Sequence, residues 1–234
     1  MALYQPSMWL PIIEGSVGST TFSRNAGGNY IKNKEIPTNP DTIRQNTMRN
    51  FLTIAAQLWR GLTQLQRDQW NAATINFPYT SIVGEIKYLS GATLFVKLNV
   101  ALLNAGQPTI TAPPLPQSIV NFTTLSGAMS FGAGSFTLLF TPTPTPLGVG
   151  ISQSSVLYAT PGISPGITNF SKYLAQIGVL AAGATSPANV AGLYTAKYGT
   201  IPAIGSKVGL ALQPTKNNSG LQGSLLKSSL IVGV

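Results

Sequence analysis

Side chains that could carry out acid–base or nucleophilic chemistry are few in this sequence. Among its 234 residues there are five carboxylates, and there is neither histidine nor cysteine. Histidine is the usual base of a catalytic triad and the commonest metal ligand, and cysteine supplies thiolate nucleophiles and zinc–thiolate sites. The sequence therefore disfavours most hydrolase and metalloenzyme mechanisms. The five carboxylates are Glu14, Glu35, Asp41, Asp68 and Glu85.

Paired carboxylates could still hydrolyse a glycosidic bond. Two of the five have structural interpretations instead: Asp41 lies near the start of a predicted helix, and Asp68 is expected to be exposed in the first turns of the next one. No glycine-rich loop followed by Lys and Ser or Thr is present to cradle a phosphate. We therefore predict that the protein is not an enzyme and uses no cofactor, metal ion or small-molecule substrate.

Charge is sparse and unevenly distributed. Charged side chains make up 8% of the residues, against about a quarter in ordinary soluble domains, and such a surface favours association with other subunits. Residues 1–85 hold all five acids and seven basic residues, whereas residues 86–234 hold seven lysines and no acid; the net charge is +9. A positive field favours an anionic partner, but these lysines are scattered along the sequence, so nucleic acid is not the favoured partner.

Residues 1–37 are rich in Gly, Ser, Asn and Thr and have no helical periodicity. We expect an extended arm or a loose hairpin that becomes ordered on its own domain or on a neighbouring subunit, with a disordered tail as the alternative. Its candidate assembly anchors are Trp9, Phe22 and Tyr30. No basic segment precedes an apolar run, so no signal peptide is expected, and no apolar stretch is long enough for a membrane span.

Residues 38–106 predict a helical domain, and its first helix has clear boundary signals. Asn39 suits the N-cap, Pro40 suits the first helical position, and Gly61 suits a left-handed stop. Apolar residues recur between them at three- and four-residue spacing, as expected for a helix with one buried face. They are Met48, Phe51, Leu52, Ala55, Leu58 and Trp59.

Two further helices are expected in this domain. Thr63 and Gln66 match a capping box, which predicts a second helix that ends before Pro78, and a third helix is expected from Ser90 to Ala105. The short first connection requires an antiparallel or sharply angled helix pair. The expected buried residues are Leu65, Trp70, Ala73 and Phe77 in the second helix and Phe95, Leu98, Ala101 and Leu102 in the third.

The sequence changes character after residue 106. Four prolines in residues 107–117 predict a stiff linker, and residues 118–234 contain short alternating apolar runs with one helical turn between Ser186 and Gly199. About six or seven short strands are typical of a small β-sandwich. The predicted fold class is α+β: an extended N-terminal arm (1–37), a small helical unit of two to three helices (38–106), a proline-rich linker (107–117) and an immunoglobulin/fibronectin-III-like β-sandwich (118–234).

The first two predicted helices carry four arginines. We interpret these either as a docking surface for an acidic partner or a phosphate backbone, or as an ordinary solvated helix face. They are Arg44, Arg49, Arg60 and Arg67.

A run in the N-terminal third resembles a family of proteins encoded in tailed-phage and prophage gene clusters. The resemblance lies in Arg24-Asn25-Ala26-Gly27-Gly28-Asn29-Tyr30, in Ile36-Pro37-Thr38-Asn39-Pro40-Asp41-Thr42, and in Gln45, Arg49, Phe51, Trp59, Leu62, Gln66-Arg67 and Trp70. In that pattern a glycine-containing arm leads into Asn-Pro-x-Thr, a Gln- and Arg-bearing helix and a Trp-bearing helix. It implies a structural component of a virion.

The favoured function is therefore a non-catalytic structural subunit of a phage virion: a capsid-associated, head–tail connecting or tail protein. It would assemble in the host cytoplasm through contacts with copies of itself and with other virion proteins. Two alternatives stay open. Loops rich in Ser, Thr, Gly and Asn suit a glycan- or cell-surface-binding β-sandwich module, and the net charge of +9 suits a nucleic-acid-associated internal protein.

Overall fold

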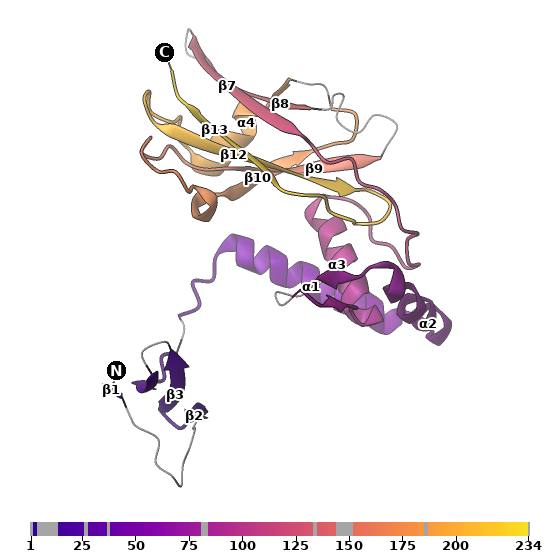
Figure 1. Cartoon of the computed structure of the whole chain (residues 1–234). Helices are drawn as coiled ribbons and strands as arrows, with labels where there is room; N and C mark the ends of the chain where they lie inside the picture. Colours follow the sequence, from indigo (N-terminus) through magenta and orange to yellow (C-terminus); the bar gives the residue numbers. More distant parts are fainter. Residues whose placement is uncertain are drawn as a thin grey trace. The chain divides into compact units, whose positions relative to one another are not determined.

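A computed structural model of the chain contains α-helices and antiparallel sheets, which confirms the predicted α+β class (Figure 1). It describes residues 2–3, 14–25, 28–36, 38–80, 84–132, 135–143, 152–184 and 187–233. The candidate anchor Trp9 and the predicted helix start at Ser186 lie outside these residues. Contacts divide the chain into two units, residues 1–43 and 44–234, while the predicted boundaries at 37, 106 and 117 stay predictions.

The first unit contains a small antiparallel sheet where the sequence suggested an extended arm or a loose hairpin. Phe22 pairs with Ile31, and Tyr30 pairs with Ser23. Because neighbouring residues of a strand point to opposite faces, the candidate anchors Phe22 and Tyr30 lie on opposite faces of this sheet. The described strands, in the order β1-β4-β3-β2, are β1 (Ala2–Leu3), β4 (Gly28–Asn33), β3 (Thr20–Asn25) and β2 (Gly15–Val17).

The helices of the second unit cover most of the predicted helical segments. Within the described residues they are α1 (Ile43–Gly61), α2 (Gln64–Ala73), α3 (Gly91–Asn104) and α4 (Ala191–Tyr198), with the short 3-10 turns η1 (Thr74–Asn76) and η2 (Ser171–Tyr173). The strand pair β5 (Tyr79–Thr80) and β6 (Ile86–Lys87) lies between η1 and α3 in the sequence. Helix α4 takes the place of the single helical turn predicted after Ser186, and it ends at Gly199 as expected, with φ +69°.

The ends of α1 differ from the predicted ones. Asp41 has a φ of +47°, and its N–H donates to Oδ1 of Asn39 at 3.4 Å, so Asn39 closes a local turn and the helix begins later, at Ile43. The helix does end at Gly61, but that residue is not left-handed. Instead, the N–H of Leu62 bonds the carbonyl of Trp59 at 3.2 Å, which tightens the last turn before α2.

Helices α1, α2 and α3 pack around one apolar cluster. Trp70 of α2 and Phe95 of α3 are fully buried in it, with ring centroids 5.1 Å apart in an edge-to-face arrangement. The ring of Trp59 lies 5.4 Å from that of Phe95. Thr63 and Gln66 form both bonds of the predicted capping box. The amphipathic pattern and the local cap therefore predicted this helical unit well.

Two residues of the predicted apolar stripes are wrongly assigned to the core. Leu52 is 49% exposed and Leu65 is 70% exposed. The residues of α1 that pack against this cluster, Leu58 and Trp59, are near its C-terminal end. Leu52 lies about 10 Å before Trp59 along the helix axis. Leu65 is five residues from Trp70, about 140° away around helix α2, so it faces solvent when Trp70 faces the core.

The predicted linker is bonded to the helices. The indole N–H of Trp70 donates to the carbonyl of Thr111 at 2.8 Å. Asn99 of α3 forms two bonds with Ile110: its Oδ1 accepts from the backbone N–H at 2.8 Å and its Nδ2 donates to the carbonyl at 3.2 Å. These bonds fix residues 110–111 against the buried side of the helical unit.

The C-terminal part forms two antiparallel sheets among the described residues, and neither is closed. They share one apolar core, to which α4 contributes Tyr194, β9 contributes Leu157 and β7 contributes Leu125. The four-stranded sheet, in the order β10-β9-β12-β13, contains β10 (Ala175–Leu180), β9 (Gln153–Ala159), β12 (Lys207–Lys216) and β13 (Leu226–Ile231). The three-stranded sheet, in the order β11-β8-β7, contains β11 (Ala188–Asn189), β8 (Ser135–Thr143) and β7 (Thr124–Gly132).

The connection between β12 and β13 packs on helix α3. Gly220 in this connection has a φ of +70°, and a Cβ at this position would lie 2.2 Å from the backbone oxygen of Leu98. The next residue, Leu221, packs against the helical cluster. The close approach of two backbones thus joins the helices to the four-stranded sheet.

Replacement of Gly220 by Ala is expected to destabilise the protein strongly. The methyl group would meet a backbone carbonyl that cannot rotate away, in addition to the left-handed strain, so we expect a loss of about 3 kcal/mol or more in the free energy of unfolding. Gly205 is the matched control: it also has a positive φ, +82°, but open space around its Cβ position. Gly205→Ala should cost only about 1 kcal/mol. Urea denaturation measures both, and equal losses would contradict the close-packing explanation.

Two tyrosines of α4, the buried Tyr194 and the half-buried Tyr198, pack at the end of strand β9. Their rings are 4.8 Å apart, and the hydroxyls donate to backbone carbonyls, Tyr194 to Thr160 at 3.2 Å and Tyr198 to Ala159 at 2.6 Å. Burial raises the pKa of Tyr194 to about 12. The pKa of Tyr198 is also raised to about 12. Burial is the larger cause, and the negative charge of ionised Tyr194 is the smaller one.

These tyrosines predict a loss of stability at alkaline pH. Their pKa values are higher in the folded than in the unfolded chain, so their contribution is complete below pH 10 and is lost as the pH rises toward 12. Urea midpoints between pH 8 and pH 11.5 should therefore fall more steeply for the native sequence than for Tyr194→Phe/Tyr198→Phe. If the urea midpoints of the two proteins fell in parallel with pH, the pKa values of these two tyrosines would not differ between the folded and unfolded chains, and the prediction would be wrong.

Candidate interaction surfaces

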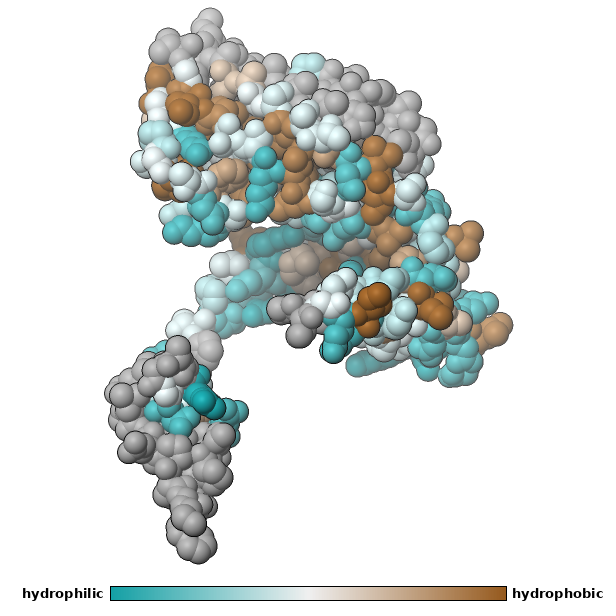
Figure 2. All heavy atoms as spheres, viewed as in Figure 1, coloured by the Kyte–Doolittle hydropathy of each residue, from teal (hydrophilic) through white to brown (hydrophobic). Residues whose placement is uncertain are grey.

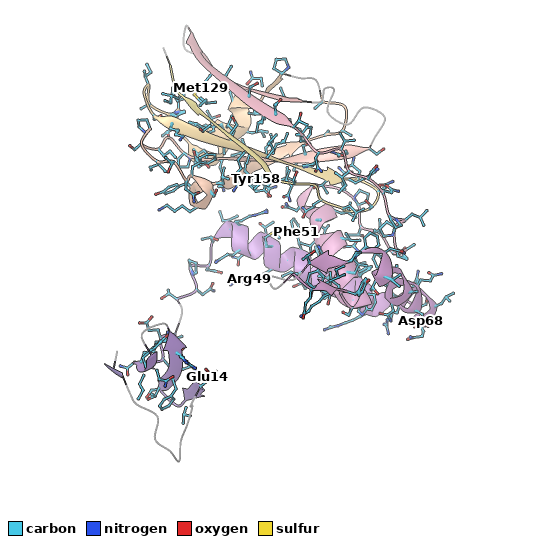
Figure 3. The ribbon with its side chains drawn as sticks, viewed as in Figure 1. Glu14, Arg49, Phe51, Asp68, Met129 and Tyr158 are labelled. Atoms are coloured by element: carbon cyan, nitrogen blue, oxygen red, sulfur yellow. The ribbon has the colours of Figure 1, made fainter. Side chains whose placement is uncertain are left out.

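Arg44, the first of the four predicted docking residues, is turned toward the second unit's own interior. Its Nη2 donates to Oδ1 of Asn104, at the end of α3, at 2.7 Å. Its charge also reaches Tyr158 of β9: burial raises the pKa of Tyr158, and the charge of Arg44 and a hydrogen bond from Asn104 partly offset that rise (Figure 3). Arg44 thus connects α1, α3 and β9.

The other three arginines lie farther along the α1–α2 pair. Nη2 of Arg67 donates to the carbonyl of Arg60 at 2.8 Å, which satisfies a carbonyl at the C-terminal end of α1. Arg49 is exposed and donates to Asn46 at 3.3 Å (Figure 3). Arg49 and Arg60 are eleven residues apart, so they share one side of α1 about 16 Å from each other. The structure therefore separates Arg44 from the rest, and docking by the remaining three stays a prediction.

Large apolar side chains are exposed over the helical part of the second unit, and Figure 2 shows apolar residues interrupting its polar surface. Among the described residues between 43 and 88 they are Ile43, Leu52, Ile54, Leu65, Ile75, Tyr79, Ile86 and Tyr88. An open hollow of about 450 Å³ beside Ile54 is also lined by Leu58, Leu62 and Thr111. Exposed apolar side chains gathered in this way are typical of surfaces that contact a partner.

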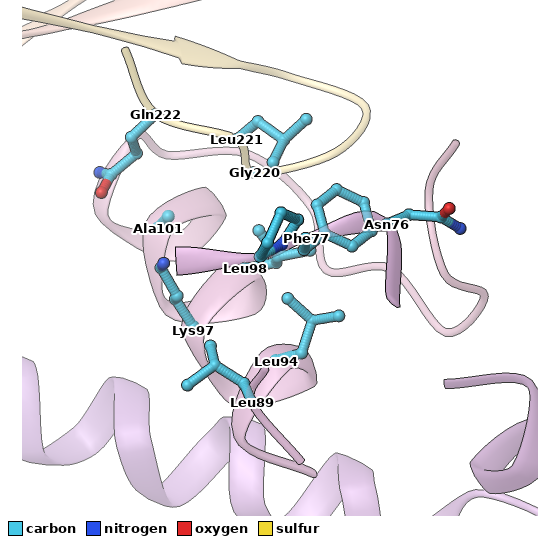
Figure 4. A pocket seen from close by; sticks show the side chains of 11 residues that line it. Asn76, Phe77, Leu89, Leu94, Lys97, Leu98, Ala101, Gly220, Leu221 and Gln222 are labelled. Atoms are coloured by element: carbon cyan, nitrogen blue, oxygen red, sulfur yellow. The ribbon is translucent and has the colours of Figure 1, made fainter. Parts of the chain in front are cut away.

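A second hollow, of about 270 Å³, lies between α3 and the β12–β13 connection (Figure 4). Phe77, Leu94 and Leu221 give it apolar walls, and Lys97 is the one charged residue in its lining. Such a hollow suits a single apolar side chain that stands beside a carboxylate. Sequence analysis missed it because its walls come from segments more than a hundred residues apart.

Neither a metal centre nor a membrane span is found in the part of the chain that the structure describes. Its acidic residues do not gather in a group that could hold a metal ion. None of the described helices combines the length and apolar character that crossing a bilayer requires.

No family model, no curated protein and no solved structure was found to match this chain.

A pair of substitutions separates the structural role of Arg44 from a docking role of the exposed arginines. Arg44→Met should lower the free energy of unfolding by about 1–3 kcal/mol, because it leaves the buried Oδ1 of Asn104 without its charged donor. Arg49→Met removes the same charge from an exposed position and should change stability by less than about 0.5 kcal/mol. Urea denaturation of both variants checks this, and an unchanged Arg44→Met protein would argue against the α1–α3 bond.

Proposed function

We propose that the protein is a non-catalytic structural subunit of a tailed-phage virion, in a capsid-associated, head–tail connecting or tail position. The observation that carries the proposal is the set of exposed apolar side chains in residues 43–88. Leu65, Ile75, Ile86 and Tyr88 are each more than half exposed, on a chain in which only 8% of residues are charged. Contact with another subunit stabilises such a surface by removing it from water. The resemblance of residues 24–70 to phage-encoded proteins favours the same function.

In this proposal residues 1–37 form the assembly arm. Val17 is 72% exposed and Ile36 is 88% exposed, and the sheet of the first unit has the aromatic rings of Phe22 and Tyr30 on opposite faces. A thin sheet cannot cover both of its own faces, so a second surface is needed. The arm of one subunit would lie on the exposed apolar side chains of residues 43–88 of a neighbouring subunit.

The two C-terminal sheets would form an immunoglobulin/fibronectin-III-like β-sandwich in the assembled subunit. The support is the shared core, in which Leu125 and Met129 of β7 belong to the same cluster as Leu226 and Leu230 of β13. Strands β7 and β13 also lie in contact with each other. The sandwich would carry surfaces for other virion components.

Assembly and folding should respond differently to two changes. Deletion of residues 1–37 should abolish higher oligomers in size-exclusion chromatography with light scattering, yet leave the circular dichroism of the remaining helices and sheets nearly unchanged. In the full chain, Leu65→Lys/Ile75→Lys should also block assembly, because charges replace exposed apolar contacts.

The matched control is Ile201→Lys/Ile204→Lys, which adds the same two charges at exposed positions outside residues 43–88. It should assemble like the native chain. Mass spectrometry of purified particles provides the second measurement. Absence of the protein from particles, or equal assembly by all four proteins, would overturn the proposal.

A further inference from the structure

The outward face of the four-stranded sheet carries a polar hollow that the proposed assembly does not use. Its volume is about 470 Å³, and it lies between residues 168–171 and strand β13. Side chains along β13 alternate, with Leu226 and Leu230 packed toward the core and Lys227 and Ser229 exposed, so the hollow faces away from the core. Its lining is an aromatic ring, hydroxyl and amide groups and one amine: Phe170, Thr168, Asn169, Ser171, Ser228, Ser229 and Lys227.

The aromatic ring of this hollow, that of Phe170, packs against Gly209. Gly209 of the central strand β12 pairs with Ser229, and a Cβ at Gly209 would lie 2.2 Å from Cδ2 of Phe170. Glycine weakens a strand interior, so its presence in β12 has a steric reason here: it admits the ring against the strand backbone. Phe170 is thereby held at the floor of the hollow rather than in the apolar core.

Lys207 lies near this ring, Lys227 lines the hollow, and Lys172 follows the lining residue Ser171 in the sequence. None of these three amines has a carboxylate among its described partners. Nζ of Lys227 donates to the hydroxyl of Ser171 at 2.8 Å. Nζ of Lys207 donates to a backbone carbonyl, that of Ile167, at 2.9 Å and lies 5.8 Å from the centroid of Phe170. Nζ of Lys172 lies 4.8 Å from the ring centroid of the adjacent Tyr173. Residues 86–234 contain no acid at all, so this segment supplies no counter-charge.

We propose that this hollow binds an acidic saccharide. A carboxylate or sulfate group would accept a bond from Lys227, which lines the hollow, while Lys207 beside the Phe170 ring would add positive charge. The hydroxyls of the sugar would bond Asn169 and the Ser and Thr side chains. The apolar C–H face of the sugar would lie on the ring of Phe170. Hydroxyl and amide groups around an aromatic ring match a sugar better than a nucleic acid, which would need a longer basic stripe than these positions provide. The site is independent of the proposed assembly contacts.

Biolayer interferometry on the full chain tests this site. The immobilised probes are a uronic-acid oligosaccharide, a sulfated glucan of the same length, a neutral glucan and a single-stranded DNA with the same number of charges. We expect binding to at least one acidic saccharide, and at least tenfold weaker binding to the neutral glucan and to the DNA. Comparable binding of either the neutral glucan or the DNA would overturn the proposal.

Charge-matched variants localise the binding. Lys227→Gln removes an exposed amine whose described partner is a single hydroxyl, so folding should be retained, and affinity for the acidic saccharide should fall at least tenfold. Lys197→Gln removes the same charge from the exposed end of α4 and should change affinity less than twofold. Phe170→Leu, which keeps all charges, should weaken binding at least fivefold. Thermal melting verifies that each variant is folded. Equal affinities of the Lys227 and Lys197 variants for the acidic saccharide would overturn the assignment of binding to this hollow.

Discussion

Helix α3 is buried along most of its length. Other segments of the second unit cover its apolar residues and form hydrogen bonds with its buried polar side chains. Its apolar residues face α2 on one side and the β12–β13 connection on the other. Full burial leaves two polar side chains, Asn99 and Asn104, that would be costly without partners. Asn99 bonds the backbone at Ile110, and Asn104 accepts from Arg44. The position of the proline-rich segment and of the first turn of α1 therefore follows from the need to pair these two amides.

Hydrogen bonds between neutral groups take the place of ion pairs in the C-terminal part. The side chain of Asn217 accepts from both the N–H and the hydroxyl of Ser154, at 2.9 and 2.7 Å. The hydroxyl oxygen of Thr160 accepts from the N–H of Gly209 at 2.8 Å in a fully buried position. Short polar side chains bury at a lower desolvation cost than charges, which is how a segment without acids can still form a specific polar interior.

Local signals in the sequence predicted local structure. The capping box at Thr63, the beginning of a helix near Ser90 and the helix stop at Gly199 depend on neighbouring residues, and the sequence pattern predicted them. The structure adds that Ser90 is the N-cap and that Gly199 is left-handed. The start of α1 was predicted wrongly because Asn39 and Asp41 can close a turn as readily as they begin a helix.

Features that depend on distant residues could not be predicted in the same way. The sheet of the first unit requires β3 to pair with both β2 and β4 within residues 15–33, and no periodicity in so short a segment specifies that pairing. Lys207 and Lys227 are twenty residues apart in the sequence, and the pairing of β12 with β13 brings both strands to the segment that contains Phe170 and Ser171. The available signal was the lack of acids after residue 85, which indicated uncompensated charge but not its location.

The absence of acids and histidines from residues 86–234 also affects how the side-chain charge of this segment responds to pH. Carboxylates and histidines are the side chains whose reference pKa values lie between about 4 and 6.5, and this segment has neither. Repulsion between such segments on adjacent copies varies instead with ionic strength, because dissolved ions screen it over about 8 Å at physiological salt. In the proposed assembly, a surface formed by residues 86–234 would therefore have a potential that depends on the salt of its surroundings, with no carboxylate or imidazole side chain of this segment to change it.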